Sequence, residues 1–120
     1  MGVGIDLVEV DRIERALLRW GDRFVDKIMG PEEAALLPGH DGRACVVALS
    51  VAVKEAASKA LGTGWTQGVA WRQVVVDVQT PACRLEGRAA EVAARRGGAA
   101  LRTTVEIRDG LALAQVRLVG

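Results

Sequence analysis

The first residues of the chain alternate between apolar and other side chains, which is the pattern of a β-strand. Within residues 2–10, one face of this strand carries Val3, Ile5 and Leu7. Asp6 lies on the opposite face, although aspartate is depleted in strands and costly to bury without a partner. We therefore interpret Asp6 either as a residue at a solvent-facing strand end or as a ligand for a hard cation such as Mg²⁺.

The pattern then changes to helical spacing. Gly21 ends the first helical segment, and Gly62 stands where a helix C-cap is expected. The last helix before Gly62 is the longest, and its first half is rich in valine and leucine, which indicates burial on most sides. The predicted helices cover residues 11–20, 22–30, 31–37 and 43–61.

The second half of the chain favours strands. Two of them are joined at Asp109-Gly110, a strong signal for a β-hairpin. Together with the first half, this order predicts a single α+β domain over residues 1–120, with a long central helix packed on a small, mostly antiparallel sheet. The expected elements are strands at 71–78, 84–86, 101–108 and 111–119 and a helix at 88–96.

Composition narrows the possible classes of protein. The chain has 120 residues, 50% of them hydrophobic, and a formal net charge of +1. With one phenylalanine and no tyrosine, it lacks the basic, aromatic-rich surface typical of nucleic-acid binding. No apolar run approaches the roughly 18 residues that span a membrane, so we expect a soluble, cytoplasmic protein. Cys45 and Cys83 lack the spacing of a zinc site or a disulfide framework.

The long helix carries a polar strip that could bind an anion. Glu55 and Lys59 are four residues apart, which is the spacing of an ordinary surface ion pair. Alternatively, the carboxylate holds a metal ion while the ammonium offsets phosphate charge. The strip consists of Lys54, Glu55, Ser58 and Lys59.

Two further features have both an ordinary and a functional interpretation. The segment Gly62-Thr63-Gly64 is either a helix stop or a place where the backbone comes close to a nucleotide, and no P-loop or Rossmann motif is present. A row of arginines near the amino terminus is either a solvated helix face or a surface for an acidic protein. Its members are Arg12, Arg15, Arg19 and Arg23.

Two motifs together resemble those of the holo-acyl-carrier-protein synthases, which are small 4′-phosphopantetheinyl transferases. They are GIDLVEVDRIE at residues 4–14 and VKEAASKALGTG at residues 53–64, and weaker similarity extends to LEGRAAEVAARRG and ALAQVRLV. The resemblance implies that a serine of an acyl carrier protein attacks the pyrophosphate of coenzyme A. The phosphopantetheine arm is then transferred, and adenosine 3′,5′-bisphosphate is released.

The resemblance also implies roles for individual residues. Asp6 and Glu55 would hold Mg²⁺, Glu55 could take the serine proton, and Lys59 would contact a phosphate. The arginine row would receive the acidic carrier protein. The family further implies a homotrimer with the coenzyme site between subunits. Contacts with coenzyme A are expected from Lys54, Ser58, Lys59, Gly62, Thr63 and Gly64.

The chain departs from the family pattern at two places. Ser50-Val51 stands where the family usually has Arg-Phe, and Arg102 to Ile107 replaces a segment that usually contains two histidines. Glu106 within that segment would repel a phosphate if it faced the site. An alternative to an active transferase is therefore a divergent relative. Such a protein would bind coenzyme A or a carrier protein as a partner of a fatty-acid or polyketide synthase.

Overall fold

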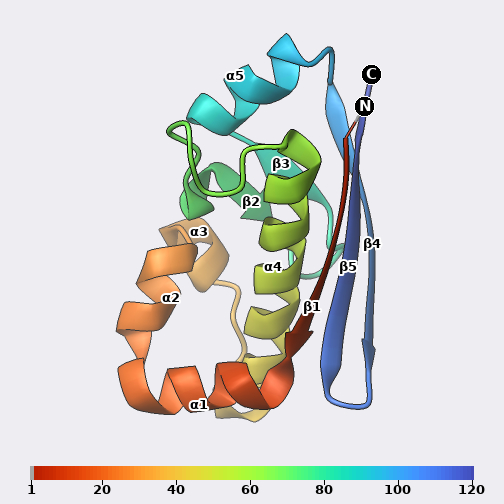
Figure 1. Ribbon diagram of the computed structural model, residues 1–120. Helices are drawn as coiled ribbons and strands as arrows, with labels where there is room; N and C mark the ends of the chain where they lie inside the picture. Colours follow the sequence, from red (N-terminus) through yellow and green to blue (C-terminus); the bar gives the residue numbers. More distant parts are fainter. Residues whose placement is uncertain (1) are drawn as a thin grey trace.

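The computed structural model describes residues 2–120, and its order of elements is that of an α+β fold (Figure 1). This confirms the fold class expected from the sequence. The elements are β1 (Val3–Glu9), α1 (Val10–Trp20), α2 (Asp22–Ile28), α3 (Pro31–Ala34), α4 (His40–Leu61), the 3₁₀ turn η1 (Trp71–Gln73), β2 (Val74–Val76), β3 (Cys83–Leu85), α5 (Gly87–Arg95), β4 (Ala100–Arg108) and β5 (Leu111–Val119).

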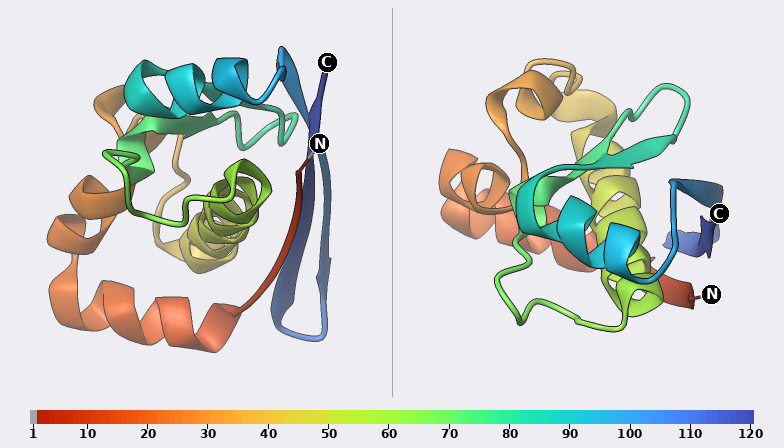
Figure 2. Two further views of the ribbon diagram at one scale, coloured as in Figure 1. Left: turned by 45° about the horizontal axis from the view of Figure 1, so that its top comes forward. Right: turned by 90° about the horizontal axis from the view of Figure 1, so that it is seen from above.

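The strands form two separate antiparallel sheets instead of the single sheet expected. The larger sheet has the order β1-β5-β4, and the smaller one pairs β2 with β3. Figure 2 shows α4 in the middle, with the three-stranded sheet on one side and the helices α1 and α2 on another. Since β2 also contacts α4, the two sheets cover different sides of the same helix.

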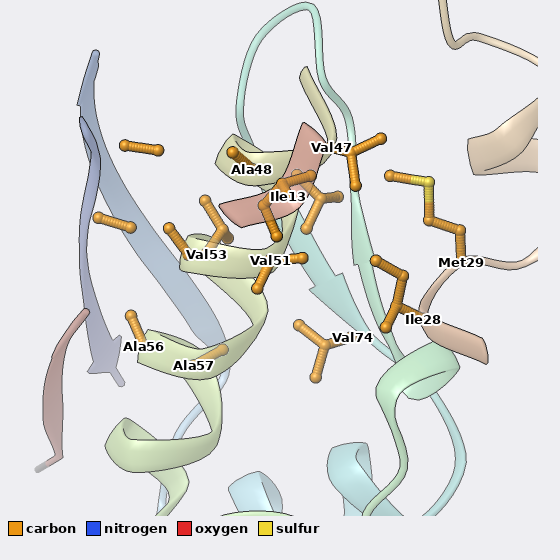
Figure 3. Close-up of a cluster of buried hydrophobic side chains, with 14 of the residues drawn as sticks. Ile13, Ile28, Met29, Val47, Ala48, Val51, Val53, Ala56, Ala57 and Val74 are labelled. Atoms are coloured by element: carbon orange, nitrogen blue, oxygen red, sulfur yellow. The ribbon is translucent and has the colours of Figure 1, made fainter. Parts of the chain in front are cut away.

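Helix α4 is central because nearly all of its surface is apolar. A row of alanines spaced four residues apart, Ala48, Ala52, Ala56 and Ala60, has no exposed surface at all. On another side, larger residues of α4 pack with α1, α2 and β2 in the main hydrophobic core (Figure 3). Burial of such side chains stabilises the fold by about 1.5–3 kcal/mol each. The long helix is thus fixed in position from several directions.

Strand β1 lies directly against α4 because two glycines remove the side chains between them. A Cβ atom on Gly2 would lie 1.7 Å from the carbonyl oxygen of Ala60, and one on Gly4 would lie 1.9 Å from that of Ala56. Both distances are far below van der Waals contact, so only glycine fits. The close approach brings Asp6, two residues after Gly4, alongside the helix.

Glycines also set the ends of the helices. Gly21 has φ +56° and separates α1 from α2. Gly42 has φ +83° and interrupts the first turn of α4, so the regular helix begins at Arg43, as the sequence predicted. Within residues 2–120, no helix is both long and apolar enough to cross a bilayer.

Candidate active site

Asp6 and Lys59 meet at the free edge of the three-stranded sheet. The ammonium nitrogen of Lys59 lies 2.9 Å from Oδ1 of Asp6 and also donates to the carbonyl oxygen of Ile5, 3.1 Å away. Because β1 is an edge strand, its outward carbonyls have no neighbouring strand to bond. Lys59 satisfies one of them. The contact therefore joins strand edge and helix at the point where the glycines bring them together.

Glu55 lies one helical turn before Lys59 and is partly exposed. The expected ion pair between Glu55 and Lys59 does not form, because Lys59 binds Asp6 instead. Among the hydrogen bonds and ion pairs of residues 2–120, none involves the Glu55 carboxylate. Glu55 thus presents a carboxylate free to bind a cation or accept a proton, on the same side of α4 as Lys59.

Asp6 and Glu55 could bind Mg²⁺ only together with a substrate that supplies further ligands. No cluster of three or more histidine, cysteine, aspartate or glutamate side chains in the described chain could hold a metal ion by itself. Mg²⁺ is commonly bound by one or two carboxylates, with water and phosphate oxygens completing its octahedral shell. Asp6 and Glu55 match that donor set. The arrangement fits a metal that arrives with, or is completed by, a phosphate group.

Lys54 does not belong to this site, which corrects the prediction that it contacts coenzyme A. Its side chain is 0% exposed and its ammonium lies 3.0 Å from a carboxylate oxygen of Glu33. The same ammonium donates to the carbonyl oxygens of Trp71, 3.0 Å away, and Val74. Burial lowers the pKa of Lys54, and the negative charge of Glu33 opposes that shift. With all three donors used, Lys54 has none left for a ligand.

Glu33 is the residue that sequence reasoning missed. Its carboxylate also accepts hydrogen bonds from the N–H groups of Gly30, at 3.1 Å, and Val76, at 3.0 Å. It lies in the short helix α3, where an acidic residue after a proline normally signals only a helix start. No pattern near Glu33 indicated its partner, Lys54, which is 21 positions away.

The structure likewise removes Ser58 as a coenzyme contact. Ser58 is buried, and its hydroxyl donates to the carbonyl oxygen of Glu55 at 2.7 Å. Just beyond it, Gly62 adopts φ +80° and caps the helix. The N–H groups of Gly62, Thr63 and Gly64 donate to the carbonyl oxygens of Lys59 or Ser58. The segment therefore stops the helix and its N–H groups are not free to hold phosphate, whereas a close approach of its backbone to a nucleotide stays a prediction.

The arginine row is divided between two helices. Arg12, Arg15 and Arg19 lie on α1, whereas Arg23 follows the break at Gly21 and lies on α2. All four are exposed, and in the described part of the chain none forms an ion pair. Arg19 lies over the ring of Trp20, 4.9 Å from its centre. The row remains a positive surface whose arginines have no ion-pair partner among residues 2–120.

The two departures from the family pattern lie in different surroundings. Ser50 and Val51 are buried, and the Ser50 hydroxyl has no hydrogen-bond partner among the described residues. Arg102 and Glu106 lie on the outer face of β4, away from α4. Glu106 pairs with Arg108 at 2.9 Å, which offsets its charge. The repulsion expected from Glu106 is thereby reduced.

Comparisons with known proteins show the family of this chain. Residues 2–114 match the family described as the 4′-phosphopantetheinyl transferase superfamily. A holo-[acyl-carrier-protein] synthase from Solidesulfovibrio magneticus is 43% identical over 122 residues, which cover 99% of this chain and 98% of that protein.

Solved structures show the same fold. The holo-[acyl-carrier-protein] synthase from Neisseria meningitidis superposes with a TM-score of 0.80 at 28% identity, covering 96% of this chain and 94% of that one. The Helicobacter pylori synthase in complex with coenzyme A gives a TM-score of 0.78 at 25% identity, covering 97% and 98%. The chain therefore belongs to the 4′-phosphopantetheinyl transferase superfamily, and within it to the holo-acyl-carrier-protein synthases.

Proposed function

We propose that this protein transfers the 4′-phosphopantetheine arm of coenzyme A to a serine of an acyl carrier protein in a Mg²⁺-dependent reaction. The observation that carries the proposal is the contact of Lys59 with Asp6 at the edge formed by β1 and α4, with Glu55 one helical turn before Lys59. Two carboxylates and one ammonium at an exposed edge are the groups that a pyrophosphate substrate requires. The family supports the same reaction class.

Asp6, Glu55 and Lys59 would together bind the metal, accept the proton and offset the phosphate charge. Asp6 and Glu55 would hold Mg²⁺, which when bound supplies positive charge to the pyrophosphate. The serine oxygen forms a bond to the phosphorus that carries the pantetheine arm, and the bridging P–O bond of the pyrophosphate breaks. Glu55, directly or through water, accepts the serine proton. Lys59 offsets the charge on the departing adenosine 3′,5′-bisphosphate.

The proposed acceptor is an acidic carrier protein that docks on α1 and α2. The exposed arginines at positions 12, 15, 19 and 23 support this partner because they have no ion-pair partner in the described chain. Charged groups at such a surface mainly accelerate association and select the partner. We place the reaction in the cytoplasm, where the free Cys45 and Cys83 stay reduced.

The proposed assembly is a homotrimer that buries the outer face of the larger sheet. On β1, Val3, Ile5 and Leu7 are 51%, 58% and 56% exposed, and Leu113 on β5 adds to the same face because it pairs with Leu7. Contiguous exposed apolar surface of this kind commonly marks an interaction site. In a trimer, the outer residues of β4 would also approach a neighbouring subunit.

A transfer assay tests the proposed reaction. The protein is incubated with coenzyme A, MgCl₂ and an acidic apo-carrier protein, and the intact mass of the carrier is followed with time. We expect wild type to add one phosphopantetheine group and Glu55→Gln to be slower by at least about 10²-fold. Chelation of Mg²⁺ should abolish transfer by wild type, and added Mg²⁺ should restore it.

The matched control is Glu86→Gln, which removes an exposed carboxylate that precedes α5 and pairs with Arg84, and it should leave transfer unchanged. The proposal is overturned if wild type modifies none of several carriers, or if wild type and Glu55→Gln behave alike. Binding of coenzyme A without transfer would instead support the alternative, in which the protein is a divergent relative that binds coenzyme A as a partner of a synthase.

A further inference from the structure

Arg96 lies where the carboxyl-terminal ends of two helices meet. It directly follows α5, and Figure 2 shows α5 passing close to the end of α4 that precedes Gly62. The Nη1 atom of Arg96 donates to the carbonyl oxygen of Ala60 at 2.8 Å. A Cβ atom on Gly62 would lie 3.0 Å from the same nitrogen. The guanidinium group therefore covers the last turn of α4, beside the exposed Gly62.

The charge of Arg96 affects which ligands can bind where the carboxyl-terminal ends of α4 and α5 meet. The carboxyl-terminal end of a helix carries about half a negative charge, so two such ends together would repel an anion. Arg96 places a full positive charge between them, whereas the ammonium of Lys59 is bound to Asp6 on β1, 2.9 Å away. The meeting point of the two helix ends thus favours an anion only because of Arg96.

Most of the hydrogen-bonding capacity of Arg96 remains unused. The guanidinium has five N–H donors, and within residues 2–120 its recorded hydrogen bond is the one to Ala60. Arg96 takes part in none of the ion pairs of the described chain, and the residue is exposed. It is held at one end by a backbone carbonyl, and its other donors are free for a ligand.

Burial of Lys54 leaves the exposed side of α4 with fewer cations than the sequence predicted. Coenzyme A carries a pyrophosphate and a 3′-phosphate, and Lys54 was one of the two lysines expected to meet them. With the ammonium of Lys54 enclosed by Glu33 and backbone carbonyls, Lys59 is the lysine left on the exposed side of α4. A second cation at the same end of the helix would supply the missing charge, and a guanidinium binds phosphate oxygens in pairs.

We propose that Arg96 binds a phosphate group of coenzyme A at the carboxyl-terminal end of α4. This inference rests on the proposed function, since it assigns a further residue to the same substrate. Gly62 contributes by lacking a side chain, which leaves room for the guanidinium. The helix-capping contact with Ala60 holds Arg96 in place before the substrate arrives.

Isothermal titration of coenzyme A into Arg96→Gln tests the assignment. The matched control is Arg95→Gln, which removes the same charge from the adjacent exposed position. We expect Arg96→Gln to bind at least about tenfold more weakly than wild type, since a charge-assisted hydrogen bond is lost. Arg95→Gln should stay within about twofold. In the transfer assay, the loss should appear mainly in KM for coenzyme A and not in kcat, which a general structural defect would not produce.

Titration of 3′-dephospho-coenzyme A identifies which phosphate is bound. If Arg96 binds the 3′-phosphate, wild type and Arg96→Gln should bind this analogue equally. If Arg96 binds the pyrophosphate, the tenfold difference should persist. Equal binding of intact coenzyme A by wild type and Arg96→Gln overturns the inference, as does an equal loss in Arg95→Gln.

A measurement on the wild-type protein covers the case in which Arg96→Gln does not fold. The arginine Nε–Hε signal of Arg96, assigned by comparison with Arg96→Lys, should shift when coenzyme A saturates the protein. An unchanged signal overturns the inference while leaving transfer intact. If wild type neither binds nor uses coenzyme A, the proposed function fails, and this inference fails with it.

Discussion

The ammonium of Lys59 lies 2.9 Å from the carboxylate of Asp6, and this contact joins residues 53 positions apart in the sequence. Lys59 is half exposed, with 51% of its side chain accessible, whereas Asp6 is 18% exposed. The pair therefore combines a flexible cation with a carboxylate held on a strand. In an active site, such a lysine can exchange a carboxylate for a phosphate at little cost, because solvent screens the pair.

We predict that Asp6→Asn and Lys59→Met separate stability from activity. Each substitution should change the free energy of unfolding by less than about 1 kcal/mol, as is usual for exposed ion pairs. Transfer should fall by at least about 10²-fold in each case. Urea unfolding and the carrier-mass assay measure the two effects. A large loss of stability with normal transfer by the folded protein would show that the pair is structural.

The buried pair of Lys54 and Glu33 should behave in the opposite way. Lys54→Met leaves the Glu33 carboxylate uncompensated inside the protein, so we expect a loss of about 3–5 kcal/mol in the free energy of unfolding. The double variant Lys54→Met/Glu33→Leu removes both charges and should recover part of that loss. Urea denaturation of the single and double variants measures the free energy of unfolding of each. If the double variant recovers no stability, the hydrogen bonds that Gly30 and Val76 donate to Glu33 contribute more to stability than the charge pair does.

Replacement of Gly4 by alanine should displace β1 from α4. The new Cβ would lie 1.9 Å from the backbone oxygen of Ala56, which cannot rotate away as a side chain could. We expect a lower melting temperature together with weaker Mg²⁺ activation, since Asp6 moves with the strand. Gly39→Ala is the control, because a Cβ there meets no atom within 4 Å. Equal melting temperatures for the two variants would contradict the close packing.

The exposed face of the larger sheet should determine the oligomeric state. Light scattering coupled to gel filtration should give wild type the mass of three chains. Ile5→Lys should shift that mass toward the monomer, because it would bury a charge in the subunit contact. Leu36→Lys, at a similarly exposed apolar position on another surface, should remain trimeric. A monomeric wild type would rule out the proposed assembly.

Charge reversal on α1 should weaken binding of the carrier protein without changing binding of coenzyme A. We expect Arg15→Glu to raise KM for an acidic carrier by about tenfold or more, while KM for coenzyme A stays unchanged. The wild-type KM for the carrier should also rise with salt, since exposed charges are screened over about 8–10 Å. Steady-state kinetics at two salt concentrations measure both effects. Parallel changes in the two KM values would place Arg15 near coenzyme A instead.

Part of the candidate site was visible in the sequence because it depends on local features. Asp6 was conspicuous as an acidic residue in a strand, and the spacing of Glu55 and Lys59 placed them on one helix face. The same reasoning placed Lys54 on that face, although it is turned by about 100° from Glu55. Its burial depends on Glu33 and on η1, and no local pattern shows which distant segment will cover a helix.

The sequence by itself determined the order and approximate place of most strands and helices, because periodicity, glycines and turn residues act within a few positions. It did not determine all their bounds: of the strand predicted over 71–78, Trp71–Gln73 form a 3₁₀ turn and only Val74–Val76 form β2. It also determined the family and the candidate carboxylates. Only the tertiary structure decided that Lys59 pairs with Asp6, that Lys54 is enclosed, and that Arg96 caps α4. These contacts connect residues 53, 21 and 36 positions apart. Such contacts form only when the whole core packs, since burial and close approach depend on all the elements together.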